Sequence, residues 1–463
     1  MIADLKPYPE YRDSGLPWLQ SVPSHWVIKR GKSYLTCVDQ RSSTGKEELL
    51  TVSSARGVIP RNTAKVTMFK AESYVGYKLC WPGDLAINSL WAWAGGLGVS
   101  QHHGIISTAY SVYRSRPSAQ LNPRFLHELV RSSAFNWELQ VRSKGIWISR
   151  LQLTDTAFLD APIPLPPPSE QAAIVRFLDW ANGRLERAIR AKRKVIALLH
   201  EQKQAIIHKA VTQGLDPTVP RKDSGVPWLG EIPAHWEVKR IKYLLREVDN
   251  RSTTGSEPLL SMRMHHGLVI FSEHFTRPPQ AATLVGFKIV KPGQFVVNRM
   301  QAGNGVIFAS RLNITGLVSP DYAVFDPIED VNVDYLGELF RTRKFRVKFR
   351  SESKGLGTGT SGFLRLYNDR FGAIHACLPT RQEQDLILQG VIMQSANLTT
   401  AIDRYEREIT LLREYRTRLV ADVVTGKLDV REAALLLPEE DVVLAPEDVV
   451  DEAEEPELEE VEG

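Results

Sequence analysis

The sequence predicts an α+β protein in which one unit, a mixed β-rich domain followed by a long helix, occurs twice. The first observation is repetition: the segments that begin at Asp13 and Asp223 read DSGLPWLQSVPSHWVIKR and DSGVPWLGEIPAHWEVKR, identical at 11 of 18 positions with a constant offset of 210 residues. The second is a set of short apolar runs punctuated by Gly and Pro-Gly turns, which is typical of strands. The third is an apolar heptad pattern at the end of each copy, which is typical of a paired helix.

The composition is that of a folded protein with several domains. At 463 residues, with 43% hydrophobic and 24% charged residues, the chain is long enough for two to four domains with separate cores. No apolar run approaches the length of a membrane span, and the first residues, MIADLKPYPE, do not form a secretory signal. The cysteines Cys37, Cys80 and Cys377 are too widely spaced for a disulfide framework or a metal pair, so we expect buried thiols and a cytoplasmic location.

The charge is unevenly distributed along the chain. The formal net charge is +4, but the segment from Glu439 to the end holds 13 acidic residues and no Lys or Arg. The rest of the chain therefore carries 58 basic against 41 acidic residues. A body this basic favours a polyanionic partner such as nucleic acid, and a duplicated unit suits duplex DNA, a ligand with two related halves.

The repeat can be followed through both β-rich domains. The segments Asp39–Gly45 and Val75–Lys78 match Asp249–Gly255 and Val285–Lys288 at the same offset of 210. The offset then becomes 213, because the second copy has a longer loop between Gly355 and Phe363. Insertions of this kind belong in surface loops.

Within the two domains we expect matching strands and helices. Strands are predicted at Ser111–Tyr113 and Tyr322–Phe325, and one helical stretch per copy at Arg124–Gln140 and Tyr335–Phe349.

The long helices have clear start and stop signals. A Pro-rich stop followed by Ser169 and Glu170 predicts a Ser-capped start for the first helix, and Thr380 to Glu383 has the spacing of a capping box. Gly214 and Gly426 are the expected terminators. Both heptad patterns are interrupted at the same heptad position, by Lys203 and Arg416, so each helix is the simplest partner for the other. The predicted seam consists of Leu185, Ile189, Ile196, Leu199, Ile206, Leu398, Ile402, Ile409, Leu412 and Leu419.

Two motif matches suggest catalysis, but neither has the required context. Gly357–Gly362 matches a dinucleotide-binding glycine pattern, yet it follows a basic stretch rather than an apolar strand and lies in the insertion of the second copy. Asp321 with Glu352 and Lys354 matches a nuclease pattern, but the first copy has neither carboxylate. The repeated His25 and His235 are expected in a packed aromatic corner. We therefore expect no catalytic residue and no metal site in this chain.

Two features together resemble the specificity subunit of type I restriction-modification systems: the PWLxxxPxHWxxKR segment and the helix starts LPPPSEQ and LPTRQEQ. The resemblance extends from about Tyr11 to Asp429 and implies two target-recognition domains, each of which reads half of a bipartite DNA site. It also implies that the two helices pair antiparallel as a coiled coil and set the spacing between the half-sites. The implied domains are a first recognition domain at 1–165, a central spacer helix at 166–215, a second recognition domain at 216–378, a distal spacer helix at 379–432 and a tail at 433–463.

The resemblance also implies partners. These are double-stranded DNA, two modification subunits that methylate adenine with S-adenosylmethionine, and restriction subunits that use ATP and Mg²⁺; no cofactor is expected on this chain and no membrane is involved. A helix from Ser169 to Val211 would be roughly 65 Å long at 1.5 Å per residue, enough to keep two recognition domains on separate groove segments.

The repeat also sorts candidate DNA-binding residues by task. Side chains shared by both copies cannot distinguish two different half-sites, so Arg41 and Arg251, Lys78 and Lys288, and Lys144 and Lys354 are expected to contact phosphates or to serve structure. Base reading is expected where the copies differ, and Gln and Asn can each make two hydrogen bonds to adenine. The complete candidate set is Arg41, Lys78, Asn88, Trp91, Trp93, Lys144, Trp147, Arg150, Arg251, Lys288, Asn298, Arg299, Gln301, Asn304, Lys354 and Arg365.

Two other functions remain open at this stage, a stand-alone restriction endonuclease and a stand-alone DNA-binding regulator. The acidic tail lies outside the pattern of the family. With 13 acids, scattered Pro and only short Val/Leu runs, it is expected to be disordered and to repel DNA or to compete with DNA for the basic domains.

Overall fold

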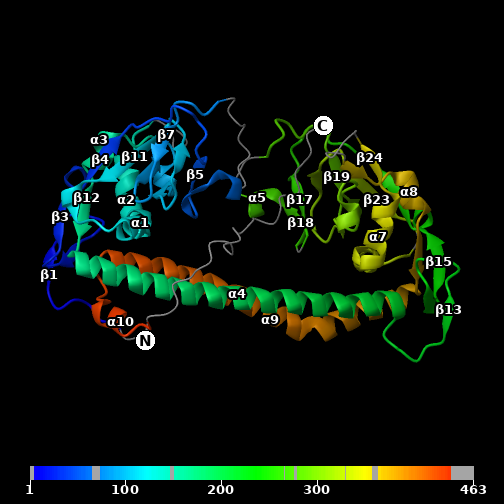
Figure 1. The fold of residues 1–463 in the computed structure, drawn as a ribbon. Coiled ribbons are helices and arrows are strands. Elements are labelled where there is room, and N and C mark those ends of the chain that lie inside the picture. The colour runs from blue at the N-terminus through cyan, green and yellow to red at the C-terminus, as the bar shows by residue number, and fades with distance from the viewer. Residues whose placement is uncertain are drawn as a thin grey trace. The chain divides into compact units, whose positions relative to one another are not determined.

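The computed structural model describes residues 5–64, 73–145, 151–264, 266–275, 279–328, 330–356 and 363–438 (Figure 1). The chain divides into two compact units. Unit 1 combines the chain up to Arg193 with the segment from Glu406 onwards, and unit 2 holds Lys194–Tyr405. Each unit therefore contains one β-rich domain and part of both long helices. Among the described helices, none is long and apolar enough to cross a membrane.

Unit 1 is built on a four-stranded antiparallel sheet with the order β4-β11-β8-β9. Its strands are β4 (Leu35–Val38), β8 (Leu85–Asn88), β9 (Leu97–Val99) and β11 (Tyr110–Ser115). Four further antiparallel pairs surround it: β1 (Tyr11–Asp13) with β2 (Ser21–Pro23), β3 (Val27–Arg30) with β12 (Pro162–Leu165), β5 (Leu50–Ser53) with β6 (Gly57–Pro60), and β7 (Lys78–Cys80) with β10 (Gly104–Ile106). The short helices are α1 (Pro123–Arg131), α2 (Ser133–Arg142) and α3 (Asp155–Leu159).

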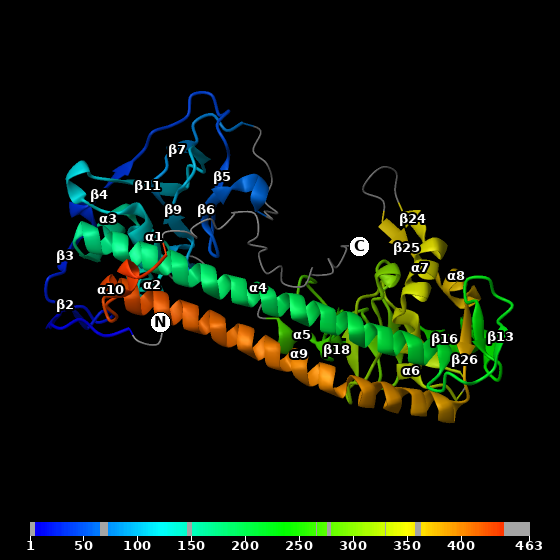
Figure 2. The ribbon, with the colours of Figure 1, turned by 60° about the horizontal axis from the view of Figure 1, so that its bottom comes forward.

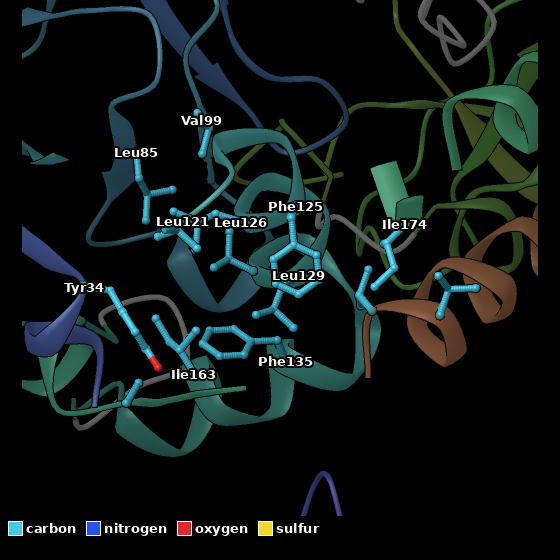
Figure 3. Close-up of a cluster of buried hydrophobic side chains, with 14 of the residues drawn as sticks. Tyr34, Leu85, Val99, Leu121, Phe125, Leu126, Leu129, Phe135, Ile163 and Ile174 are labelled. Carbon is cyan, nitrogen blue, oxygen red and sulfur yellow. The ribbon is translucent and has the colours of Figure 1, made fainter. Parts of the chain in front are cut away.

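The core of unit 1 lies where α1 and α2 meet the sheet. Figure 3 shows Phe125, Leu126 and Leu129 of α1 beside Leu85 and Val99 of the sheet, all of them buried. The same buried cluster continues to Ile174 in the first turns of the long helix. The β-rich domain of unit 1 is thus packed onto the helix that follows it in the sequence.

Unit 2 repeats this topology element by element. Its sheet has the order β16-β23-β20-β21, from β16 (Leu245–Val248), β20 (Phe295–Val297), β21 (Ile307–Ala309) and β23 (Ala323–Pro327). The surrounding pairs are β13 (Arg221–Asp223) with β14 (Glu231–Pro233), β15 (Glu237–Arg240) with β26 (His375–Leu378), β17 (Leu260–Arg263) with β18 (Gly267–Ile270), and β19 (Lys288–Val290) with β22 (Gly316–Val318). The helices are α5 (Phe271–His274), α6 (Val333–Arg341), α7 (Arg343–Glu352) and α8 (Asn368–Ala373), and β24 (Lys354–Leu356) pairs with β25 (Phe363–Arg365).

The predicted helical stretch of each copy is wrong in one respect, because it consists of two helices rather than one. Ser132 and Thr342 adopt extended backbone conformations, which end α1 and α6 and start α2 and α7. The Ser132 hydroxyl accepts a hydrogen bond from the Phe135 amide, as an N-cap side chain does. The predicted strands at Ser111–Tyr113 and Tyr322–Phe325 are confirmed in β11 and β23, apart from Tyr322, which precedes β23.

The two long helices are α4 (Pro168–Gln213) and α9 (Arg381–Val424), and a short helix, α10 (Arg431–Leu435), follows α9. Both long helices end as predicted, at Gly214 and Gly426 in the left-handed conformation, with φ of 78° and 77°. The predicted cap at Ser169 is wrong, because α4 already begins at Pro168 and the Pro167 carbonyl accepts the first helical amide bonds. Thr380 does accept from the Glu383 amide, at 3.4 Å.

Within each unit, α4 and α9 run antiparallel, and Figures 1 and 2 show them side by side. In unit 1 Lys192 pairs with Glu408 at 2.6 Å and Glu186 with Arg416 at 3.1 Å, while in unit 2 Lys203 donates to Thr399 at 2.9 Å. The seam interruptions Lys203 and Arg416 therefore have polar partners on the facing helix. All ten predicted seam residues are buried or half-buried, whereas Leu198 and Leu411 outside the seam are 54% and 62% exposed.

Candidate nucleic-acid interface

The repeated His-Trp pair and the Glu at each helix start form one structural device. In unit 1 the Glu170 carboxylate accepts hydrogen bonds from the Trp26 indole at 2.7 Å and the Tyr8 hydroxyl at 2.6 Å, and contacts His25 Nε2 at 2.8 Å. Trp26 is buried and also lies against Gly426 at the end of α9. We call this contact the glutamate anchor of unit 1.

Unit 2 has the same anchor with fewer partners. Glu383 accepts from the Trp236 indole at 3.0 Å and contacts His235 Nε2 at 2.8 Å, and Trp236 lies against Gly214 at the end of α4. The glutamine after each of these glutamates makes a further contact. Gln171 accepts a hydrogen bond from the backbone amide before α1, and Gln384 accepts one from the backbone amide before α6. The two motifs that carry the family resemblance thus fasten each β-rich domain to the helices, which agrees with the structural assignment of His25 and His235.

The shared arginines lie in matching turns. Arg41 makes two hydrogen bonds to Asp39, and Arg251 makes the same contact with Asp249. The hydrogen bond from Arg41 holds the pKa of Asp39 below its usual value. Both arginines are exposed and paired to a neighbour two residues away, so they remain accessible to a phosphate while they also support the turn.

The shared lysines differ in exposure. Lys78 is half-buried and donates to the Tyr110 carbonyl at 2.8 Å. Lys288 is only 3% exposed and lies 3.3 Å from Asp249 and 3.8 Å from Glu247. A buried ammonium between two carboxylates is not placed to contact a DNA phosphate, so for Lys288 the structure supports the structural task and not the DNA contact.

Asn88 and Asn298 hold the loops in which the two copies differ. The Asn88 side chain accepts from the Leu90 amide at 3.2 Å, and Asn298 accepts from the Met300 and Gln301 amides. Asn298 is 6% exposed. Both residues position a short 3-10 turn, Ala92–Ala94 in unit 1 and Ala302–Asn304 in unit 2. Both side chains therefore have a structural task in these turns, and Asn88, which is half-buried, is the more accessible of the two.

The unit 1 turn presents two stacked indoles. Trp91 is 57% exposed and its ring lies 5.9 Å from that of Trp93, with an angle of 18° between the planes. Trp93 is half-buried and fixed by a hydrogen bond from its indole to the Leu90 carbonyl at 3.0 Å. An exposed aromatic surface held in one orientation can stack on a base or cover a sugar.

The unit 2 turn presents amides instead. Asn304 donates to the Gln301 side-chain oxygen and accepts a hydrogen bond from Arg350 of α7 at 2.8 Å. Both loop residues are half-buried. The Gln301 and Asn304 amides are thus joined to a guanidinium in one chain of hydrogen bonds, which fixes the order of donors and acceptors that the loop presents.

Arg299 and Arg365 converge on Asp321 beside this turn. Arg299 donates to the Asp321 carbonyl at 2.8 Å, and Arg365 pairs with the Asp321 carboxylate at 3.3 Å. Burial and the neighbouring Arg365 lower the pKa of Arg299. Lys354 is exposed and lies opposite Arg365 in the β24–β25 hairpin. The structure therefore brings Arg299, Gln301, Asn304, Lys354 and Arg365 into the part of unit 2 where α7, the hairpin and the turn meet.

The corresponding part of unit 1 is described less completely. Lys144 is exposed and pairs through its backbone with Gln152. The candidates Trp147 and Arg150 lie outside the described residues, as do the glycine pattern at 357–362 and the acidic tail from Glu439.

The basic face of α7 is not among the candidate residues predicted from the sequence. This helix, RKFRVKFRSE, carries five basic side chains, of which all but Lys348 are exposed. In the sequence this face is visible as the basic stretch that precedes the glycine pattern.

The carboxylates of the nuclease pattern do not converge. Asp321 is paired with Arg365, and Glu352 is paired with Lys348 and Arg370. Across the residues that the structure describes, no group of three or more His, Cys, Asp or Glu could hold a metal ion. The geometry thus offers basic and aromatic surfaces beside two variable turns.

Comparison with solved structures identifies the fold. A chain from the structure described as "Structural basis underlying complex assembly and conformational transition of the type I R-M system" matches with a TM-score of 0.54 and 16% identity, over 88% of this chain and 99% of that chain. The HsdS subunit from Thermoanaerobacter tengcongensis matches with a TM-score of 0.38 and 15% identity, over 89% and 98% of the two chains. The type I restriction-modification S subunit from M. genitalium matches with a TM-score of 0.32 and 12% identity, over 90% and 99%.

No family model and no curated protein matches the sequence. At 16% identity the first of these likenesses shows the fold alone, over nearly the full length of both chains. The protein therefore has the fold of a chain from a type I restriction-modification system.

Proposed function

We propose that this chain is the DNA-recognition subunit of a type I restriction-modification complex, and that each unit reads one half of a bipartite DNA site. The observation that carries the proposal is the combination of identical topology with different turns. The two units share their sheet order and glutamate anchors, but one presents Trp91 and Trp93 where the other presents Gln301 and Asn304. Two domains of the same fold that present different side chains at these turns are suited to a DNA site whose two halves differ in sequence.

The chemistry is carried by partner subunits in this proposal. Two modification subunits would dock on the paired helices α4 and α9 and methylate adenine with S-adenosylmethionine, and restriction subunits would use ATP and Mg²⁺. The exposed apolar side chains Ile392 and Met393 of α9, 68% and 78% exposed, support a docking role because they lie outside the helix seam. The two alternatives are a stand-alone endonuclease and a stand-alone regulator. Among the described residues, no contact between side chains favours either of them.

The test is reconstitution. The purified chain with its modification subunits is expected to transfer methyl groups to a split site in duplex DNA, and each component alone is expected to transfer none. Sequencing of methylated adenines gives the site. Methyl transfer or DNA nicking by the isolated chain would contradict the proposal and favour an enzyme.

A further inference from the structure

Helix α7 of unit 2 differs in charge from its counterpart in unit 1, α2, although both helices pack in the same way. In α7 Phe345 and Phe349 are buried in unit 2, and at the same places in α2 Phe135 and Leu139 are buried in unit 1. The side chains around these buried positions differ in charge. Where α7 has Arg343, Lys344, Arg346, Lys348 and Arg350, α2 has Ser133, Ala134, Asn136, Glu138 and Gln140.

The comparison of α2 with α7 shows whether the basic residues are needed for the helix to form. Unit 1 forms the same helix in the same place without the basic residues, so the fold does not require them. Lys344 donates to the Leu229 carbonyl and Lys348 pairs with Glu352, so these two have structural partners. Arg343, Arg346 and Arg350 are exposed, and among the described residues none of the three has a carboxylate partner. Three unneutralised arginines on one helix repel one another, which favours an anionic ligand on this face.

The same face borders the unit 2 reading turn. A Cβ atom on Gly303 would lie 3.1 Å from the Arg350 Cβ, and one on Gly305 would lie 3.2 Å from the Arg346 Cδ, so both arginines lie directly against the two glycines of the turn. Arg350 also donates to Asn304. In duplex DNA a phosphate strand runs along each edge of a groove, so side chains beside a base-reading turn meet phosphates.

We infer that the exposed arginine face of α7 binds the DNA backbone beside the unit 2 turn, and that unit 2 therefore supplies more of the salt-dependent affinity for DNA than unit 1. The inference rests on the proposed function and adds an unequal division of labour to it. Arginine suits this task because its planar guanidinium matches two phosphate oxygens at once. An acidic protein surface could use the same charges, but the contact with the reading turn favours DNA.

The experiment measures binding of the full-length chain to duplex DNA of mixed sequence over a range of salt concentrations. The variant R343Q/R346Q removes two charges without touching the Arg350–Asn304 contact. It is expected to bind every sequence more weakly and to lower the slope of log K against log salt by about two. The conservative variant R343K/R346K keeps both charges and is expected to restore the slope.

A matched control is R246Q/R311Q, which removes the same charge from unit 2 at exposed arginines already paired with carboxylates. It is expected to lower the slope by much less. An unchanged slope in R343Q/R346Q, or an equal change in both double variants, would overturn the inference. Loss of assembly with the modification subunits at an unchanged slope would assign the face to a protein partner and would also overturn it. If the unaltered chain binds no DNA at all, the proposed function itself fails.

Discussion

At the scale of single residues, the side chains that differ between the copies carry the proposed specificity. Trp91 offers an exposed indole face in unit 1, whereas Gln301 and Asn304 offer amide donors and acceptors in unit 2. The shared Arg41 and Arg251 repeat one turn in both units and so cannot distinguish half-sites. The repeat predicts this division, because a side chain that both copies share at matching places offers the same contacts to both half-sites.

The first prediction compares the two turns. W91A is expected to relax the preference at one half of the methylated site only, and Q301A/N304A at the other half only. Loss of one two-bond amide contact to a base removes about 1–3 kcal/mol of discrimination, which is roughly a 5- to 150-fold effect. Sequencing of methylated adenines on a randomised target measures both halves together. Relaxation of the same half by both variants would refute separate reading.

The second prediction concerns His127, whose Nδ1 accepts the Val99 amide at 3.2 Å and links α1 to β9. Burial, with smaller effects of Arg131 and Arg124, lowers its pKa to about 4. An unfolded histidine titrates near 6.5, so the unfolded chain binds the proton first and the free energy of unfolding falls as the pH drops from about 6.5 toward 4.

The variant H127Q keeps an acceptor for the Val99 amide but cannot titrate. Its unfolding transition, followed with denaturant between pH 7 and pH 5, is expected to depend less on pH than that of the unaltered chain. The substitution lies in unit 1, and unit 2 has Gly337 and thus no titrating side chain at the matching place. The unfolding of unit 2 is therefore expected to be the same in both proteins. Equal pH dependence of the unit 1 transition in the two proteins would contradict the assignment.

At the scale of elements, the glutamate anchors connect each β-rich domain to the start of one long helix and the end of the other. Sequence reasoning assigned Glu170 and Glu383 to the first helical turn and went no further. Their partners Trp26 and Trp236 are 144 and 147 residues away, and local capping rules cannot report such contacts. The seam residues, by contrast, followed from the heptad period because burial in a two-helix pair repeats with that period.

The third prediction uses the two anchors as matched sites. E170A leaves two buried donors, Trp26 and Tyr8, without their acceptor, whereas E383A leaves only Trp236. Each buried donor without an acceptor costs roughly 1–3 kcal/mol. E170A is therefore expected to lower the free energy of unfolding of its unit more than E383A does. Denaturant titration of both variants measures the difference, and a larger loss in E383A would show that the anchors are not the source.

At the scale of the whole molecule, duplication explains most of what the sequence could predict. Matching segments at offsets of 210 and then 213 predicted two domains of the same topology. The structure confirms this prediction, including the isolated backbone bridges Arg41–Lys78 and Arg251–Lys288. Exposure within the site was not predictable, because it depends on packing between distant segments. Lys288 is an example, because it matches Lys78 in the sequence. In the structure, however, only Lys288 is buried between two carboxylates.

The central claim, that each unit reads one half of the DNA site, is tested most directly by exchanging one recognition domain. The segment Leu16–Pro164 ends within β12 and stops before α4, so its replacement by the matching segment of another chain of this fold leaves both long helices intact. The exchanged protein, assembled with its modification subunits, is analysed by sequencing methylated adenines. The account predicts that one half of the site changes while the other half and the spacing stay the same. A change in both halves would contradict it and would indicate a single composite reading surface.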